Sequence, residues 1–223
     1  YANLDTEEIR RFSSSYTRSE LEEWFTHLTE AYQKWAQMQL EWKTERKASI
    51  GKTVFPYPYR EGQKELASAV YRTIWHGKKL FIQAPTGVGK TLSTVFPAVQ
   101  AVGQELGDKI FYLTAKTITR TVAEEAFSLL KKQGLHYKVL TLTAKEKICF
   151  CEEPDCNPEK CPYAKGHFDR VNDAVYELLT SYEENSANYS RERIMEQAEK
   201  WKVCPFEMAL DVSLWSDAII CDY

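Results

Sequence analysis

Hydrophobic positions recur at intervals of three and four along residues 21–42. They follow Thr17 and Glu20, whose spacing is that of a capping box at a helix N-terminus. The pattern predicts one long amphipathic helix that ends near Arg46. We expect its apolar stripe to pack against other elements rather than to form a cofactor or DNA-stacking surface. The stripe comprises Leu21, Trp24, Phe25, Leu28, Ala31, Tyr32, Trp35, Met38 and Trp42.

Strand and helix patterns alternate in the middle of the chain. Residues 49–58 contain glycine and proline and predict a linker, and residues 60–76 predict a helix that Gly77 stops. The elements predicted next are strands near 79–84, 109–115, 137–143 and 217–223, and helices near 90–103 and 117–133. This alternation predicts an α/β fold with a parallel sheet and helices on both faces.

Residues 144–216 interrupt the alternation with helical patterns near 167–183 and 190–202. The formal net charge of −3 gives no global basic signature for nucleic acid. No apolar run approaches a membrane span and no signal peptide opens the chain, so we expect a cytoplasmic protein without a membrane partner. The chain starts without Met and stops directly after an apolar strand pattern, so we expect a piece of a longer protein.

The most specific motif follows the first predicted strand of the alternation. Ala84–Thr91 has the form A-x-x-x-x-G-K-T and leads into a predicted helix, which is the context of a phosphate-binding loop. Its glycines let successive N–H groups face one anion, and the helix N-terminus adds positive potential. We predict that ATP binds at Thr86, Gly87, Val88, Gly89, Lys90 and Thr91. Lys90 and Thr91 are the candidate catalytic residues, reaching the phosphates and Mg²⁺ respectively.

Five of the six cysteines lie between positions 149 and 204. In a cytosolic nucleotide-binding protein such a cluster favours a metal site over disulfides. The spacing Cys149-x6-Cys156-x4-Cys161-x42-Cys204 has one zinc-like pair and otherwise suits a [4Fe–4S] cluster, so spacing leaves both metals open. Cys151 is one residue from Cys149 on an extended chain, so one of the two is a spare. Cys221 fits a small core residue.

The loop and the cysteines together resemble the iron–sulfur superfamily 2 helicases, the XPD and DinG group. Four further stretches carry the resemblance. Tyr59-Arg60-x-x-Gln63 is similar to the family's adenine-reading element, and residues 113–117 are similar to motif Ia. Residues 145–149 are similar to the basic run before the first cluster cysteine, and residues 203–207 to the segment that carries the last one. The match covers roughly residues 52–223.

The resemblance implies a RecA-like motor domain with an inserted, mostly helical iron–sulfur domain. It implies a [4Fe–4S] cluster on Cys149, Cys156, Cys161 and Cys204, at the fork where the duplex splits. It implies adenine recognition by Arg60 and Gln63, and contacts to single-stranded or forked DNA from Thr114, Lys116, Thr117 and Lys145. ATP and Mg²⁺ would drive translocation on single-stranded DNA, and DNA repair is the expected setting.

The implied layout has four parts. Residues 1–50 form a connector with the long helix, 51–144 the first half of the motor domain, 145–216 the cluster insertion and 217–223 a returning strand. The connector resembles that of members with an N-terminal nuclease domain. The family's DEAH box and second motor domain do not occur in this sequence, so we expect the chain to lack ATPase activity alone and to work with the rest of its own protein.

Two alternatives from other classes remain at this point. One is a P-loop ATPase or switch that does not act on DNA. The other is a metal-stapled nucleic-acid-binding or scaffold module that no longer uses nucleotide, against which the intact Lys90 and Thr91 argue.

Overall fold

The structure is a computed structural model that describes residues 6, 8–85, 87–115, 117–153, 155–181 and 188–222, without the side chains of residues 117 and 118. It divides into two compact units, Tyr1–Leu40 and Glu41–Tyr223. The long helix α1, Arg18–Lys52, contributes residues to both units.

Helix α1 begins where the capping box predicts. The Thr17 backbone N–H donates to Glu20 Oε2 at 2.7 Å, and the Glu20 N–H donates to Thr17 Oγ1 at 3.3 Å. The helix continues past the predicted end at Arg46 to Lys52. The packing predicted for its apolar stripe was wrong for the first unit, where Trp24 is 61% exposed. It is correct for the end of the stripe, where Trp42 is buried.

The second unit contains a parallel sheet with the strand order β1-β4-β2-β3 among the described residues. Its strands are β1, Ile110–Thr114, β2, Val139–Thr141, β3, Asn188–Tyr189, and β4, Ala218–Asp222. The predictions near 109–115, 137–143 and 217–223 are confirmed. The two-residue strand β3 was not predicted, because a pair of residues carries no periodicity.

Residues 79–84, predicted as a strand, form no ladder with any described strand. Phe81 in this segment is 93% exposed. The apolar run is present, but strand formation also requires a neighbouring strand to accept and donate backbone hydrogen bonds. The edge strands of the described sheet are β1 and β3, and this segment pairs with neither of them.

Seven further helices are described, and most follow the sequence pattern. They are α2, Gln63–Trp75, α3, Lys90–Gly103, α4, Thr117–Lys131, α5, Lys145–Ile148, α6, His167–Thr180, α7, Arg191–Trp201, and α8, Pro205–Trp215. Helices α5 and α8 were missed. Helix α8 is apolar around much of its circumference, so it lacks the contrast between faces that marks an amphipathic helix. None of the described helices has the length and apolar character needed to cross a membrane.

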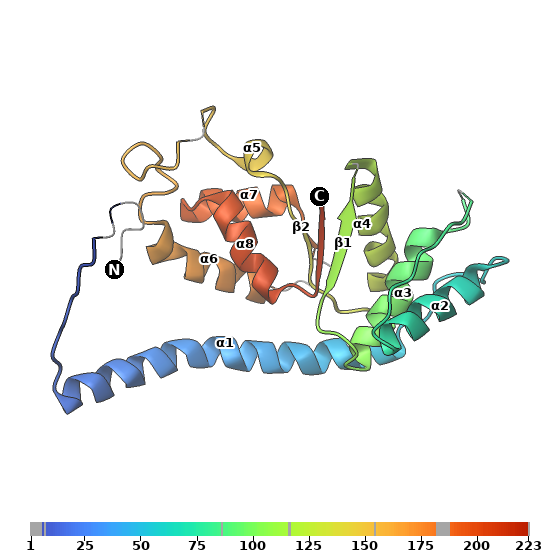
Figure 1. The fold of residues 1–223 in the computed structure, drawn as a ribbon, viewed down its shortest axis with the longest axis horizontal. Coiled ribbons are helices and arrows are strands. Elements are labelled where there is room, and N and C mark those ends of the chain that lie inside the picture. The colour runs from blue at the N-terminus through green and yellow to red at the C-terminus, as the bar shows by residue number, and fades with distance from the viewer. Residues whose placement is uncertain are drawn as a thin grey trace. The chain divides into compact units, whose positions relative to one another are not determined.

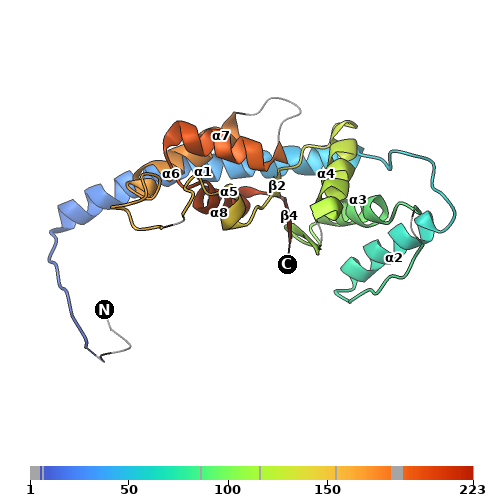
Figure 2. The same ribbon diagram turned by 90° about the horizontal axis from the view of Figure 1, so that it is seen from above.

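Helices flank the strands of the second unit on both sides. Figures 1 and 2 show α3 and α4 grouped on one side, and α6, α7 and α8 packed together on the other. The main core joins α3 and α4 to the sheet through buried residues such as Val99, Phe127 and Ile220, and Ile50 of α1 belongs to it. The sheet is thereby held between two helical layers.

Asp217, immediately before β4, anchors the end of α1 to the sheet. Its carboxylate is 3% exposed and accepts hydrogen bonds from Trp42 Nε1 at 2.9 Å, Arg46 Nη1 at 2.6 Å and the Lys138 backbone N–H at 2.7 Å. Burial raises the pKa of Asp217, and the Arg46 guanidinium acts in the opposite direction. Since buried carboxylates are costly unless paired, these donors make the docking of α1 specific.

Candidate functional site

The phosphate-binding loop ends at α3, whose first residue is Lys90. Gly87 and Gly89 have φ angles of +85° and +73°, in the left-handed region that favours glycine. Gly89 directly precedes the helix, so the first N–H groups of α3 lie at the end of the loop. This is the backbone geometry that suits an anion. Thr86, also predicted to bind nucleotide, lies outside the described residues.

Gln63 and Arg60 each donate a hydrogen bond to a backbone carbonyl of the phosphate-binding loop. Gln63 Nε2 donates to the Val88 carbonyl at 2.8 Å, and Gln63 Oε1 accepts from the Arg60 backbone N–H at 2.8 Å. Arg60 Nη1 donates to the Gly87 carbonyl at 2.7 Å. Gln63 is 5% exposed, although sequence alone made an exposed helix position equally plausible. Both predicted adenine-reading residues therefore lie beside the loop.

Lys90 folds over the start of the loop. Its ammonium donates to the carbonyls of Ala84 at 2.8 Å and Pro85 at 2.7 Å. Thr91, the next residue of α3, is half-buried at the same helix end. A phosphate placed at the helix N-terminus offers Lys90 a charged acceptor in exchange for these neutral carbonyls, which strengthens the contact.

Thr114, one of the predicted DNA-binding residues, lies at the carboxyl edge of the sheet. Thr114 ends β1, is 6% exposed, and its hydroxyl contacts that of Thr119 in α4. In the register of the sheet Thr114 pairs with Asp222, whose Oδ2 is 3.5 Å from Arg120 Nη1. Lys116 lies outside the described residues, and of Thr117 only the backbone, at the start of α4, is described.

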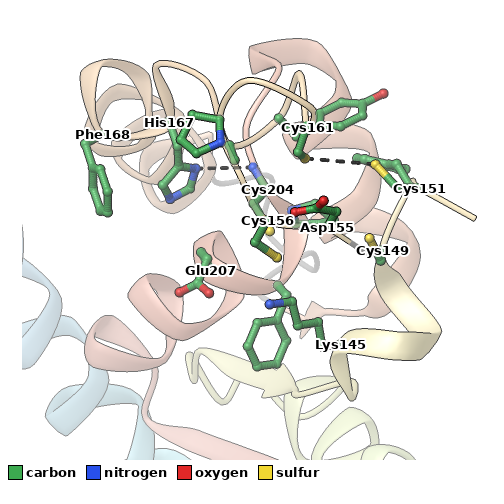
Figure 3. A pocket seen from close by; sticks show the side chains of 16 residues that line it. Lys145, Cys149, Cys151, Asp155, Cys156, Cys161, His167, Phe168, Cys204 and Glu207 are labelled. Carbon is green, nitrogen blue, oxygen red and sulfur yellow. Dashed lines mark hydrogen bonds between the residues drawn. The ribbon is translucent and has the colours of Figure 1, made fainter. Parts of the chain in front are cut away.

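Five cysteines line one cavity of about 300 Å³. Figure 3 shows Cys149, Cys151 and Cys161 on one side of the cavity and His167 on the other, with Cys204 between them. Cysteines from three separate stretches of the chain are thereby brought together, including Cys204 from the end of a long insertion. The lining cysteines are Cys149, Cys151, Cys156, Cys161 and Cys204.

The thiols differ in their surroundings. Cys156 is exposed, whereas Cys161 is buried. The sulfur atoms of Cys151 and Cys161 are 3.9 Å apart. Burial, with the neighbouring Cys161 and Cys149 thiols, raises the pKa of Cys151 to about 11. Burial also raises the pKa of Cys204, against the effect of the Phe206 and Glu207 backbone N–H groups.

No group of three or more His, Cys, Asp or Glu side chains that could hold a metal ion occurs in the described part of the chain. The sulfurs of Cys151 and Cys161 are 3.9 Å apart, close to the roughly 3.8 Å that separates two thiolates on one tetrahedral zinc ion. Thiolates bind both zinc and iron–sulfur clusters, so the five cysteines of the cavity fit the donor chemistry of either centre.

Lys145, predicted to meet DNA near the cysteines, lines the cysteine cavity. Its ammonium is 5.9 Å from the centre of the Phe206 ring. The side chain of Cys156 raises the pKa of Lys145. A cation at this place offsets the negative charge of thiolates, a role that the sequence pattern did not suggest.

Comparison with known proteins relates part of the chain to a helicase family. Residues 60–150 match the model of the DEAD/DEAH box helicase family. This stretch runs from Arg60 through the phosphate-binding loop to the start of the cysteine cavity, and with its parallel sheet and flanking helices it fits an α/β RecA-like fold.

Among curated proteins, the chain is similar to one described as a probable ATP-dependent helicase from Methanocaldococcus jannaschii. The two are 47% identical over 49 residues, which are 22% of this chain and 8% of that protein. The chain thus matches a small part of the relative's length. The match supports an ATP-dependent helicase in general terms.

Proposed function

We propose that this chain is part of an ATP-dependent DNA helicase of the iron–sulfur group, and that it translocates on single-stranded DNA within the longer protein. The observation that carries the proposal is that one chain combines a helicase-family phosphate-binding loop with five cysteines around one cavity. Either feature alone fits many proteins. A nucleotide switch that does not act on DNA does not require the cysteine cavity. A metal-stapled scaffold that no longer uses nucleotide does not require the phosphate-binding loop.

ATP binds at the loop in this proposal. The α3 N-terminus and the N–H groups from Gly87 to Thr91 receive the phosphates, and Lys90 moves from the Ala84 and Pro85 carbonyls to the β- and γ-phosphates. Thr91 contributes a hydroxyl to Mg²⁺. Arg60 and Gln63 keep the loop shape through their hydrogen bonds to Gly87 and Val88 and present their remaining donors to adenine.

In this proposal DNA lies along the carboxyl edge of the sheet, where Thr114 ends β1, and Lys116 and Thr117, which come next in the sequence, also contact it. Hydroxyls, backbone amides and an ammonium suit phosphate oxygens, so the contacts do not depend on base sequence. Residues 145–216 form the insertion at the fork. The Lys145 ammonium there offsets the negative charge of the cysteine thiolates and of the DNA backbone.

The metal centre is a [4Fe–4S] cluster held by Cys149, Cys156, Cys161 and Cys204. The cluster would cross-link cysteines from stretches that lie far apart in the sequence. Zinc is the second candidate, and the 3.9 Å separation of the Cys151 and Cys161 sulfurs favours it. Iron, acid-labile sulfide and zinc contents of anaerobically purified protein separate the two.

The DNA part of the proposal is tested by binding of a fluorescent single strand at several salt concentrations. Affinity should fall as salt rises, because lysines displace counterions from phosphates. Lys116→Ala should weaken binding and reduce the salt slope by about one unit, with little dependence on base sequence. Lys132→Ala, at an exposed position of the same region of the chain, serves as the control. Salt-independent binding, or none, would favour the nucleotide switch that does not act on DNA.

A further inference from the structure

A buried histidine stands at the cysteine cavity outside the proposed ligand set. His167 is the first residue of α6, is 3% exposed and lines the same cavity as the cysteines. Its Nδ1 accepts a 3.2 Å hydrogen bond from the backbone N–H of Cys204. Figure 3 shows this bond on the side of the cavity away from the sulfurs of Cys149, Cys151 and Cys161.

The hydrogen bond fixes the tautomer of the ring. A nitrogen that accepts from an N–H carries no proton, so the proton of the neutral imidazole is on Nε2. Burial lowers the pKa of His167, which keeps the ring neutral at pH 7. Nε2 is buried and has no hydrogen-bond partner within the described residues. Because Nδ1 already accepts the hydrogen bond from the Cys204 N–H, Nδ1 is not available to bind a metal.

The peptide that His167 holds is the one that carries a proposed ligand. Cys204 is the N-cap of α8, and Pro205 follows it at the first helical position. The orientation of this peptide therefore sets both the start of α8 and the direction of the Cys204 N–H. Backbone N–H groups that donate to cluster or ligand sulfurs raise the reduction potential of an iron–sulfur centre. An N–H that donates to His167 is withheld from the sulfurs.

We propose that His167 is a positioning residue of the metal centre, which holds the Cys204 N–H away from the sulfurs and so keeps the reduction potential of the cluster low. The inference rests on the [4Fe–4S] cluster of the proposed function. It assigns His167 a role through the Cys204 backbone and none as a ligand. His167 follows Cys161 by six residues, which is not a standard zinc-knuckle spacing.

Three substitutions separate this role from simple packing. His167→Asn puts an amide oxygen near the position of Nδ1 and retains an acceptor. His167→Gln puts its amide near the position of Nε2, and His167→Leu has no acceptor. In the latter two variants the Cys204 N–H loses its partner, and the acceptors that line the cavity are the cysteine sulfurs and the carboxylates of Asp155 and Glu207.

The test measures iron and acid-labile sulfide content, then the midpoint potential by redox titration followed by electron paramagnetic resonance. We expect wild type and His167→Asn to share one potential, and His167→Leu and His167→Gln to shift positively by about 59 mV, a tenfold change in a one-electron equilibrium. Equal potentials in all loaded proteins, or an equal shift in all three variants, would overturn the role of His167 and leave the cluster standing. Wild type without iron and sulfide would overturn the proposed centre itself.

Should His167→Leu fail to fold, His167→Gln remains the acceptor-shifted variant, because it stays polar and of similar length. A loaded His167→Gln protein with an unchanged potential contradicts the inference on its own.

Discussion

The Gln63 side chain and the Val88 carbonyl are joined by a 2.8 Å hydrogen bond that ties the start of α2 to the phosphate-binding loop. The contact leaves no room at the neighbouring Gly89, where an added Cβ would lie 2.4 Å from Gln63 Nε2. Gln63, which lies 25 positions before Val88 in the sequence, therefore packs directly against the loop. The loop is shaped by α2 as well as by its own glycines.

Gly87→Ala and Gly89→Ala form a matched pair. Both place a side chain at positive φ, which costs about 1–2 kcal/mol, but nothing lies within 4 Å of a Cβ at Gly87. We expect Gly89→Ala to weaken ATP binding at least about tenfold more than Gly87→Ala, and Gln63→Ala to restore part of the loss in Gly89→Ala. Fluorescent-nucleotide titration of wild type, Gly89→Ala, Gln63→Ala and the double variant gives the coupling, separate from any loss that Gln63→Ala causes alone. Strictly additive effects would show that Gln63 does not press on Gly89.

Arg46→Met should strongly destabilise the second unit. It removes the guanidinium that pairs with the buried Asp217 carboxylate, and breaking a buried pair costs about 3–5 kcal/mol. Lys47→Met is the control, since its partner Glu105 is 76% exposed and such pairs contribute about 0–1 kcal/mol. Urea unfolding under reducing conditions measures both. Similar losses in the two variants would mean that Asp217 does not anchor α1.

The stability of the second unit should depend on pH through two buried lysines. Burial lowers the pKa of Lys131 to about 7 and that of Lys138 to about 8, from 10.5. Above pH 7 the unfolded chain therefore binds more protons than the folded one, and the free energy of unfolding rises with pH. Each group contributes at most about 1.4 kcal/mol per pH unit. The window is pH 7 to 9, above which the raised pKa of Cys151 acts in the opposite direction.

Lys131→Met tests this dependence against Lys132→Met, because Lys131 is buried and Lys132 is exposed. Unfolding curves at pH 7, 8 and 9 should show a flatter rise for Lys131→Met than for wild type, while Lys132→Met follows wild type. If the free energy of unfolding rose equally with pH in all three proteins, the Lys131 ammonium would be solvated and its pKa would not be lowered by burial.

Serine substitutions should divide the cysteines into two groups. Cys149→Ser, Cys156→Ser, Cys161→Ser and Cys204→Ser should each abolish the broad visible absorption that thiolate-bound iron gives. Cys221→Ser, in strand β4, should retain it. Cys151→Ser is the sharpest variant, because Cys151 lines the same cavity as the ligands and is expected to be the spare. If Cys151→Ser lost the visible absorption and Cys149→Ser retained it, Cys151 would be the ligand and Cys149 the spare cysteine.

Local features of the fold were predictable because their causes are local. The capping box at Thr17, the stop of α2 before Gly77 and the glycines of the phosphate-binding loop depend on residues within a few positions of one another. The start of α3 at Lys90 was predicted for the same reason. The candidate site around Lys90 was thus largely visible in the sequence.

Features that depend on distant partners were not predictable. Residues 79–84 have a strand pattern but form no ladder with a described strand, and helix α8 carries little contrast between its faces. The buried Asp217 meets Trp42 and Arg46 across most of the chain, and no spacing rule connects them. His167 is placed against Cys204 only by the packing of α6 on α8.

The most direct test of the central claim, that the loop before α3 is a nucleotide site, is the ATP affinity of Lys90→Ala. We expect its dissociation constant to exceed that of wild type at least tenfold, about 1.4 kcal/mol, because a charge-assisted contact to phosphate is lost. Lys132→Ala should bind ATP as wild type does. Equal ATP affinity in wild type and Lys90→Ala would contradict the account, since the loop would then not be where nucleotide binds.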